Sequence, residues 1–192
     1  MTYLVTGGAG FIGSNFTRHL LLSDPEASVI ILDSLSYAGR LTNLADVLPP
    51  FSVFQPSPHG EAARIEFDDT GSMTVSFPVA ETLGRWKGRL EGWSPVCLPR
   101  DNLGKDVGEF LRSGRSRIAF VIGSCVDRSI TDQLVPLADR VINLAAETHV
   151  DRSIRDAERF LIGNVLGVHA LLEAARGCPN VEKILHVSTD EV

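Results

Sequence analysis

Short apolar runs alternate with longer segments of helical periodicity along most of the chain. The apolar runs hold few polar residues, which is typical of strands buried on both faces of a parallel sheet. They predict strands at residues 3–6, 29–32, 118–122, 141–145 and 184–188. A helical repeat that stops at Gly177 and Pro179 predicts a long helix over 156–176. This order predicts an α/β fold, a doubly wound parallel sheet of about five strands with helices on both faces.

Residues 49–116 break this alternation and are richer in Pro, Gly, Ser and Arg. Within them, residues 64–67 and 73–77 alternate apolar and polar side chains around a Gly-containing turn, which predicts a β-hairpin. Connections inside compact α/β units are about two to six residues long, so this segment is an insertion, a lid or a disordered excursion. We interpret the chain as one domain, residues 1–48 and 117–192, interrupted by an irregular insertion of unknown role.

Composition and charge narrow the function classes. The chain has 192 residues, of which 44% are hydrophobic, enough for a domain with a sizeable core. The formal net charge of −6 and the absence of a Lys/Arg cluster argue against a nucleic-acid partner. No apolar run reaches membrane-spanning length and no signal segment opens the chain, so we expect no membrane partner and a cytoplasmic location. Cys97, Cys125 and Cys178 lack the spacing of a metal site or a disulfide framework.

A glycine-rich turn near the N-terminus carries the strongest functional signal. Gly7, Gly10 and Gly13 join the first predicted strand to a helix, and Asp33 follows at the end of the second strand. Such glycines allow a tight bend, a close backbone approach to a pyrophosphate, and close helix–strand packing, while the helix start offers N–H groups to phosphate. A carboxylate at the position of Asp33 accepts hydrogen bonds from ribose hydroxyls and repels a 2′-phosphate. The sequence therefore predicts a dinucleotide site that selects NAD over NADP.

Five sequence motifs carry a family resemblance: residues 6–16, 32–39, 144–154, 164–176 and 186–192. Together they resemble the extended short-chain dehydrogenase/reductase family, also called the NAD-dependent epimerase/dehydratase family, and within it the dTDP-glucose 4,6-dehydratases. The resemblance covers about residues 1–48 and 117–192 and only the N-terminal part of the family. It implies an incomplete Rossmann-like sheet, without the C-terminal substrate-binding part.

The resemblance implies a lyase reaction on a nucleotide sugar, from dTDP-glucose to dTDP-4-keto-6-deoxyglucose. Hydride leaves C4 for NAD, water is eliminated across C5 and C6, and the hydride returns to C6. By the same resemblance Asp190 is the acid for the C6 hydroxyl, Glu191 is the base at C5, and Thr189 hydrogen-bonds the sugar near O4. Two carboxyl groups can divide these tasks when their environments separate their pKa values.

The binding residues are assigned by the resemblance as well. The cofactor positions are Gly7, Gly10, Phe11, Ile12, Gly13, Asp33, Ser34, Leu35, Ser36, Ser124, Cys125, Leu144, Ala145, Ala146 and Glu147. The substrate positions are Thr148, Thr189, Asp190 and Glu191, and no metal is implied. We assign His149 no catalytic role. The resemblance is compatible with a homodimer.

Three departures from the family pattern argue against catalysis by this chain alone. The family's Tyr-x-x-x-Lys pair is missing, because Tyr3 and Tyr37 are the only tyrosines and neither is followed four residues later by Lys. Ser124 and Cys125 stand where the family has Asp-Ile, and Gly163 stands where it has threonine. Loss of a general base costs about two to four orders of magnitude in rate, so we expect the chain to be inactive on its own.

Three other interpretations stay open. A nucleotide-sugar epimerase, such as a UDP-glucose 4-epimerase, shares the fold and the cofactor but has no use for the adjacent Asp190 and Glu191. A non-catalytic NAD-binding module fits the missing Tyr-x-x-x-Lys pair. An inert remnant that does not fold stably would follow from an exposed sheet edge.

Overall fold

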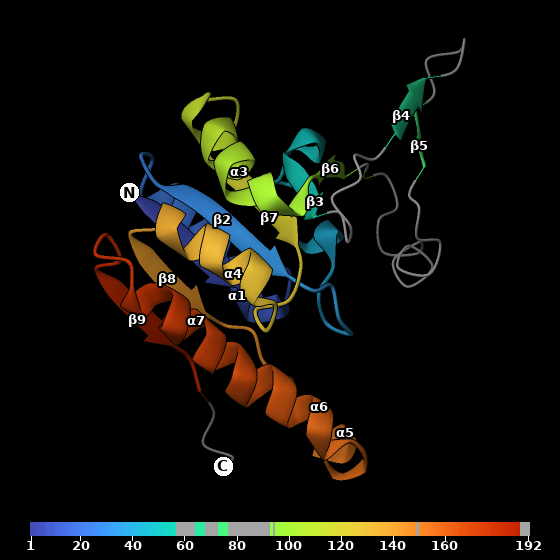
Figure 1. Ribbon diagram of the computed structural model, residues 1–192, viewed down its shortest axis with the longest axis vertical. Coiled ribbons are helices and arrows are strands. Elements are labelled where there is room, and N and C mark those ends of the chain that lie inside the picture. The colour runs from blue at the N-terminus through green and yellow to red at the C-terminus, as the bar shows by residue number, and fades with distance from the viewer. Residues whose placement is uncertain (57–63, 68–72, 77–92, 94, 149, 189–192) are drawn as a thin grey trace.

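The structure, a computed structural model, describes residues 1–56, 64–67, 73–76, 93, 95–148 and 150–188 (Figure 1). Its centre is a parallel sheet with the strand order β6-β3-β7-β2-β1-β8-β9. The strands are β1 (Thr2–Thr6), β2 (Ser28–Asp33), β3 (Val53–Pro56), β6 (Val96–Leu98), β7 (Ile118–Ile122), β8 (Arg140–Asn143) and β9 (Lys183–His186). The five predicted strands are all present, and each boundary lies within two residues of its predicted position.

The sheet is wider than the sequence pattern indicated, with seven strands among the described residues instead of about five. The two additional strands, β3 and β6, come from residues 49–116 and extend the sheet beyond β7. The same stretch supplies helix α3 (Leu103–Arg112) and the predicted hairpin, whose strands β4 (Arg64–Phe67) and β5 (Met73–Ser76) pair antiparallel. Part of this segment therefore belongs to the main sheet.

Helices cover both faces of the sheet (Figure 1). Besides α3, they are α1 (Phe11–Ser23), α4 (Arg128–Leu134), α5 (Val150–Arg155), α6 (Ala157–Phe160) and α7 (Gly167–Arg176). Short 3₁₀ turns are η1 (Leu41–Leu44), η2 (Pro50–Ser52), η3 (Arg100–Asn102) and η4 (Val135–Leu137), and η5 (Leu161–Leu166) is a π-helix. The long helix predicted over 156–176 is present as α6, η5 and α7 in succession, so a wider π-helical turn occupies its middle.

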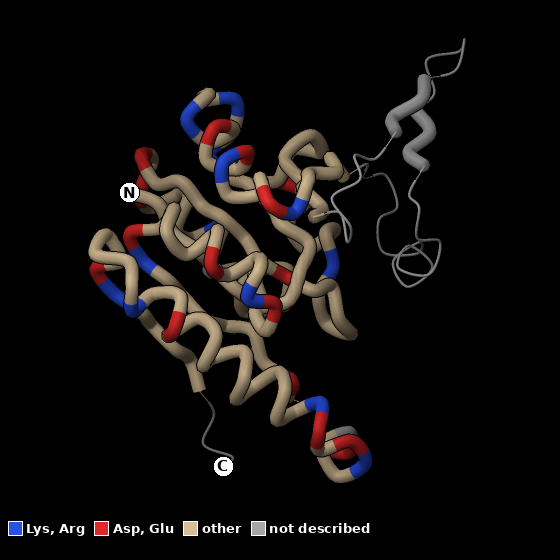
Figure 2. The backbone as a smooth tube through the Cα atoms, in the orientation of Figure 1, with Lys and Arg blue, Asp and Glu red and all other residues tan. Residues whose placement is uncertain are grey.

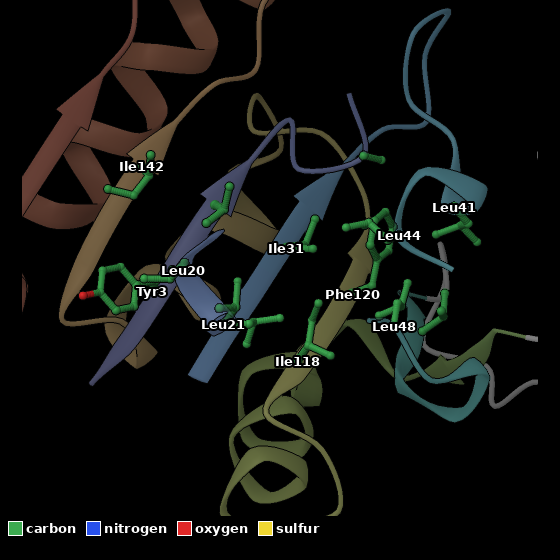
Figure 3. Close-up of a cluster of buried hydrophobic side chains, with 14 of the residues drawn as sticks. Tyr3, Leu20, Leu21, Ile31, Leu41, Leu44, Leu48, Ile118, Phe120 and Ile142 are labelled. Atoms are coloured by element: carbon green, nitrogen blue, oxygen red, sulfur yellow. The ribbon is translucent and has the colours of Figure 1, made fainter. Parts of the chain in front are cut away.

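Alternate residues of each central strand enter two separate cores. On one face Leu20 and Leu21 of α1, with Leu44 of η1, pack against strand residues such as Ile31 and Phe120 (Figure 3). On the other face the neighbouring strand positions pack against α3, α4 and α7. Leu4, Ile30, Leu32, Ala119 and Val121 belong to this second core. Burial on both faces explains why these strands are uninterrupted apolar runs in the sequence.

Charged residues of both signs are distributed over the described part of the chain (Figure 2). Figure 2 shows Lys and Arg interspersed with Asp and Glu along the helices and loops. Among the described residues no helix is both long and apolar enough to cross a membrane.

Candidate functional site

The loops that follow β1, β2, β7 and β8 meet at one edge of the sheet, because the carboxyl ends of neighbouring parallel strands point the same way. These loops line a cavity of about 330 Å³, within the range of ligand pockets. Its lining residues are Gly7, Gly10, Phe11, Ile12, Gly13, Leu32, Asp33, Ser34, Ser36, Tyr37, Ala38, Gly39, Gly123, Ser124, Cys125, Leu144, Ala145, Ala146, Glu147, Thr148, Gly163 and Asn164.

The turn between β1 and α1 accepts only glycine at two positions. Gly7 has a φ of +69°, and a Cβ atom there would lie 2.7 Å from the Cα atom of Ala145. A Cβ atom on Gly13 would overlap the carbonyl oxygen of Gly7 and lie 2.7 Å from the Cα atom of Gly8. These close approaches bring the start of α1 against both its own turn and the loop after β8.

The start of α1 has the properties of an anion-binding site. Gly10 precedes the helix without a side-chain cap, and the first turn contains no acidic residue. The first N–H groups of a helix have no acceptor within the helix, and they form the positive end of its dipole. Phe11 and Ile12 are 82% and 64% exposed beside the cavity. A negatively charged group would be stabilised at this position.

Asp33 is buried at the end of β2 and is held by the backbone on both sides. Its Oδ2 atom accepts a hydrogen bond from the N–H of Ala9 at 2.9 Å, and its Oδ1 atom accepts one from the N–H of Leu35 at 2.8 Å. Burial raises the pKa of Asp33 above the ordinary 3.8, although both hydrogen bonds act in the opposite direction. Since each carboxylate oxygen has two lone pairs, both oxygens can accept a further hydrogen bond from a ligand.

Asn164 of the π-helix η5 fixes the loop that follows β8. Its side-chain amide donates to the carbonyl oxygen of Glu147 at 2.9 Å and accepts from the N–H of Glu147 at 2.8 Å. The Oε1 atom of Glu147 accepts hydrogen bonds from Arg159 at 2.9 and 3.0 Å, whereas its buried Oε2 atom has no hydrogen-bond partner among the described residues. Glu147 is therefore held at the cavity wall through its backbone and its Oε1 atom.

The loop after β7 closes another side of the cavity with small and weakly polar groups. Burial raises the pKa of the Cys125 thiol, so this thiol stays protonated at neutral pH. A Cβ atom on Gly167 would lie 2.8 Å from the Sγ atom of Cys125, which explains how α7 packs so closely behind this loop. Together with Ser124, this side of the cavity carries no formal charge at neutral pH.

Most residues that the resemblance assigned to the cofactor lie around this one cavity. They are Gly7, Gly10, Phe11, Ile12, Gly13, Asp33, Ser34, Ser36, Ser124, Cys125, Leu144, Ala145, Ala146 and Glu147, and Thr148 joins them. Leu35 does not line the cavity, because its side chain is buried in the core and only its N–H reaches Asp33. The expected catalytic residues Thr189, Asp190 and Glu191 lie outside the described residues, as does His149.

Several lining residues were not assigned to the cofactor or the substrate from the sequence. They are Leu32, Tyr37, Ala38, Gly39, Gly123, Gly163 and Asn164. Their closeness to the predicted strand ends was a usable signal for Leu32, Gly39 and Gly123. No local pattern could have paired Asn164 with Glu147, or the hydroxyl of Tyr37 with that of Thr148, which are hydrogen-bonded at 2.8 Å.

Comparisons with known proteins agree with this geometry. The sequence model of the NAD dependent epimerase/dehydratase family matches residues 3–85, and that of GDP-mannose 4,6 dehydratase matches residues 101–192. Both matched ranges extend into residues 49–116, which the sequence resemblance had left out. This agrees with the presence of β3, β6 and α3 in the main fold.

Individual relatives align with the whole chain. The low-salt glycan biosynthesis protein Agl12 of Haloferax volcanii is 34% identical over 192 residues, and a dTDP-glucose 4,6-dehydratase of Mycolicibacterium smegmatis is 32% identical over 192 residues. Each match covers 100% of this chain but only 40% and 37% of the relative. The chain thus spans about two fifths of the length of these relatives.

Solved structures give the same relationship. The crystal structure of DesIV, a dTDP-glucose 4,6-dehydratase from Streptomyces venezuelae with NAD and TYD bound, superimposes with a TM-score of 0.60 at 32% identity. That match covers 100% of this chain and 40% of DesIV. A UDP-glucose 4-epimerase from Thermotoga maritima, at 22% identity and a TM-score of 0.55, shares the fold. From the two family matches, the full-length alignments and the Rossmann-like sheet, we conclude that the chain belongs to the NAD-dependent epimerase/dehydratase family.

Proposed function

We propose that residues 1–192 form the NAD-binding domain of a nucleotide-sugar 4,6-dehydratase of the dTDP-glucose type. The observation that carries the proposal is one cavity that unites the glycine turn, Asp33 and the loop after β8. Support also comes from the dTDP-glucose 4,6-dehydratases that align with the whole chain. Because the chain spans about two fifths of these relatives, the activity of the complete enzyme is part of the proposal.

The residues around the cavity fit the parts of NAD. The N–H groups at the start of α1, behind Gly10, suit the pyrophosphate because they offer donors and a positive dipole end to an anion. Asp33 suits the hydroxyls of the adenosine ribose, and the uncharged pair Ser124 and Cys125 suits the adenine. This assigns the loop over residues 144–147 to the nicotinamide half of NAD.

The charge of Asp33 gives a reason to prefer NAD over NADP. A 2′-phosphate on the ribose would lie against the carboxylate that accepts the ribose hydroxyls, and juxtaposed like charges cost several kcal/mol. We therefore expect NAD to bind about tenfold more tightly than NADP, or better.

Bound in this cavity, NAD would supply the acceptor for a hydride from the sugar and the donor that returns it, as the family resemblance implies. Thr189 would hydrogen-bond the sugar near O4, Asp190 would protonate the departing C6 hydroxyl, and Glu191 would remove the C5 proton, as the family resemblance implies. The 192 residues contain no Tyr-x-x-x-Lys pair to act at the C4 hydroxyl. We therefore propose that they bind NAD without converting a nucleotide sugar on their own.

The remaining assignments rest on the sequence interpretation and, for the substrate, on one of these relatives. We propose a nucleotide sugar such as dTDP-glucose as the substrate of the complete protein, since DesIV was solved with TYD bound. A homodimer and a cytoplasmic location are further parts of the proposal.

Calorimetric titration of the folded chain tests the proposed function. We expect NAD to bind, NADP to bind about tenfold more weakly, and dTDP-glucose with NAD to yield no 4-keto sugar. A folded chain that does not bind NAD at millimolar concentration contradicts the proposal. Formation of the 4-keto sugar would contradict only the part that denies turnover.

A further inference from the structure

A hydrogen bond between two side chains crosses the candidate cofactor cavity. The hydroxyl oxygens of Tyr37 and Thr148 lie 2.8 Å apart, although the residues are separated by 111 positions in the sequence. Tyr37 belongs to the loop after β2 and Thr148 to the loop after β8, and both line the cavity.

The strand order explains what this bond crosses. β1 lies between β2 and β8 and pairs with both of them. The loops after β2 and β8 therefore stand on opposite sides of the glycine turn that follows β1. Neighbouring strands are about 4.8 Å apart, so the ends of β2 and β8 are separated by roughly twice that distance. The side chain of Tyr37 is long enough to bridge this gap above the turn.

Both loops are held by the rest of the site, so the two hydroxyls face each other from fixed positions. The loop that carries Tyr37 is anchored before it by the hydrogen bond from Leu35 to Asp33 and after it by one from the N–H of Arg40 to the carbonyl oxygen of Ala9 at 3.1 Å. The loop that carries Thr148 is anchored one residue earlier by the Asn164 amide. Separation of the hydroxyls is therefore a rotation of side chains rather than a rearrangement of loops.

We propose that Tyr37 gates the cofactor cavity: its hydrogen bond to Thr148 forms a strap over the bound dinucleotide. This inference rests on the proposed function, because it places the pyrophosphate on the glycine turn beneath the strap. The strap is closed both before and after binding, and it opens each time the dinucleotide binds or leaves.

This arrangement has a kinetic signature. A bond that is present in the free and bound states but broken during passage slows association and dissociation by the same factor. Loss of the bond raises both rate constants equally and leaves Kd unchanged. A neutral hydrogen bond at a solvent-exposed position corresponds to about a two- to fivefold change in rate. Loss of a direct contact between Tyr37 and the cofactor would instead raise only the dissociation rate, and with it Kd.

Stopped-flow fluorescence with NADH as the probe tests the strap on the full 192-residue chain. The variants are Tyr37→Phe, Thr148→Val and the two combined, each of which removes a hydroxyl and nearly preserves side-chain shape. Tyr3→Phe is the matched control, because Tyr3 lies in β1 outside the cavity, with its ring beneath the guanidinium of Arg140. Circular dichroism and thermal unfolding confirm that every variant is folded.

We expect each single variant to raise the association and dissociation rates of NADH equally, about two- to fivefold. The double variant should exchange NADH no faster than either single variant, since both substitutions remove the same bond. The strap is overturned if the two rates change unequally, if the effects of the two single substitutions add in the double variant, or if the rates do not change. None of these outcomes contradicts the proposed function. If the unmodified chain does not bind NADH, both proposals fail.

Discussion

The Oδ2 atom of Asp33 accepts a hydrogen bond of 2.9 Å from the N–H of Ala9, which ties the end of β2 to the glycine turn after β1. The carboxylate thus fixes the turn in addition to facing the cavity. Gly39 completes this arrangement, because a Cβ atom there would lie 2.5 Å from the Oδ1 atom of Asp33. The site predicted to hold the ribose and the turn predicted to hold the pyrophosphate are therefore one connected unit.

Asp33→Asn should weaken NAD binding about tenfold or more. The amide loses the charge that strengthens hydrogen bonds from ribose hydroxyls, and hydrogen bonds to charged groups contribute about 1.5–3 kcal/mol. Its NH₂ group must also face one of the two N–H donors that now bind the carboxylate. The preference for NAD over NADP should shrink, because the repulsive charge is gone. Titrations with NAD and NADP measure both affinities. The control is Asp101→Asn, because Asp101 is exposed. An unchanged preference for NAD would refute the role of Asp33.

Acidification should weaken NAD binding at a pH above the ordinary pKa of an aspartate. Burial raises the pKa of Asp33 above 3.8, and the ribose hydroxyls require its charged form as acceptor. NAD affinity therefore falls as the pH decreases through this raised pKa. The pH dependence of folding stability has the opposite sign to that of NAD affinity. The contribution of Asp33 to stability is fully present below 3.8 and is lost as the pH rises through the raised pKa.

Titrations with NAD at decreasing pH check this dependence, with thermal unfolding at each pH as the control for folding. In Asp33→Asn the corresponding loss of affinity should disappear. A variant that retains the full pH dependence would assign it to another group.

Gly13→Ala should abolish most NAD binding and destabilise the chain. The added methyl group would overlap the carbonyl oxygen of Gly7 and force α1 away from its turn. Overpacking of this kind costs about 1–3 kcal/mol of folding stability. Gly177→Ala is the matched control, because a Cβ atom there has nothing within 4 Å and the φ of −91° suits alanine. Urea unfolding measures the stability of both variants, and titration measures their NAD affinity. Equal stability and equal affinity in the two variants would contradict the close packing at Gly13.

Asn164→Ala should cost about 1–3 kcal/mol of stability, because it leaves the N–H and carbonyl of Glu147 without their side-chain partner. NAD affinity should fall as well, since the loop that lines the cavity loses its anchor. Asn102→Ala is the control, because Asn102 makes no side-chain cap hydrogen bond at the start of α3. Chemical denaturation gives the stability, and an unchanged midpoint for Asn164→Ala would show that the amide clamp contributes nothing.

Local signals explain which parts of the fold the sequence predicted. The unbroken apolar runs of β1, β2 and β7 and the spacing of Gly7, Gly13 and Asp33 each follow from short-range physics, namely burial on both faces and steric limits at a turn. β3 and β6 were missed because they are short, lie in an irregular stretch and gain their pairing only from β7 and from each other.

The unpredicted parts of the site depend on contacts between distant residues. Asn164 reaches Glu147 from the π-helix η5, and Tyr37 reaches Thr148 across the strand between them. Periodicity within a window of the sequence contains no record of such pairs. The sequence therefore predicted which loops line the cavity, but not how these loops are fastened to one another.

Hydrogen exchange of the chain with and without NAD shows whether the dinucleotide lies on the glycine turn, because it locates the bound ligand on the backbone. We expect slower exchange of amides in the glycine turn and first turn of α1, residues 7–14, and in the loops at 33–39 and 144–148. Exchange in α3, on the opposite side of the sheet from α1, should not change. Protection confined to other segments, or NAD binding with no protection of residues 7–14, would contradict the account.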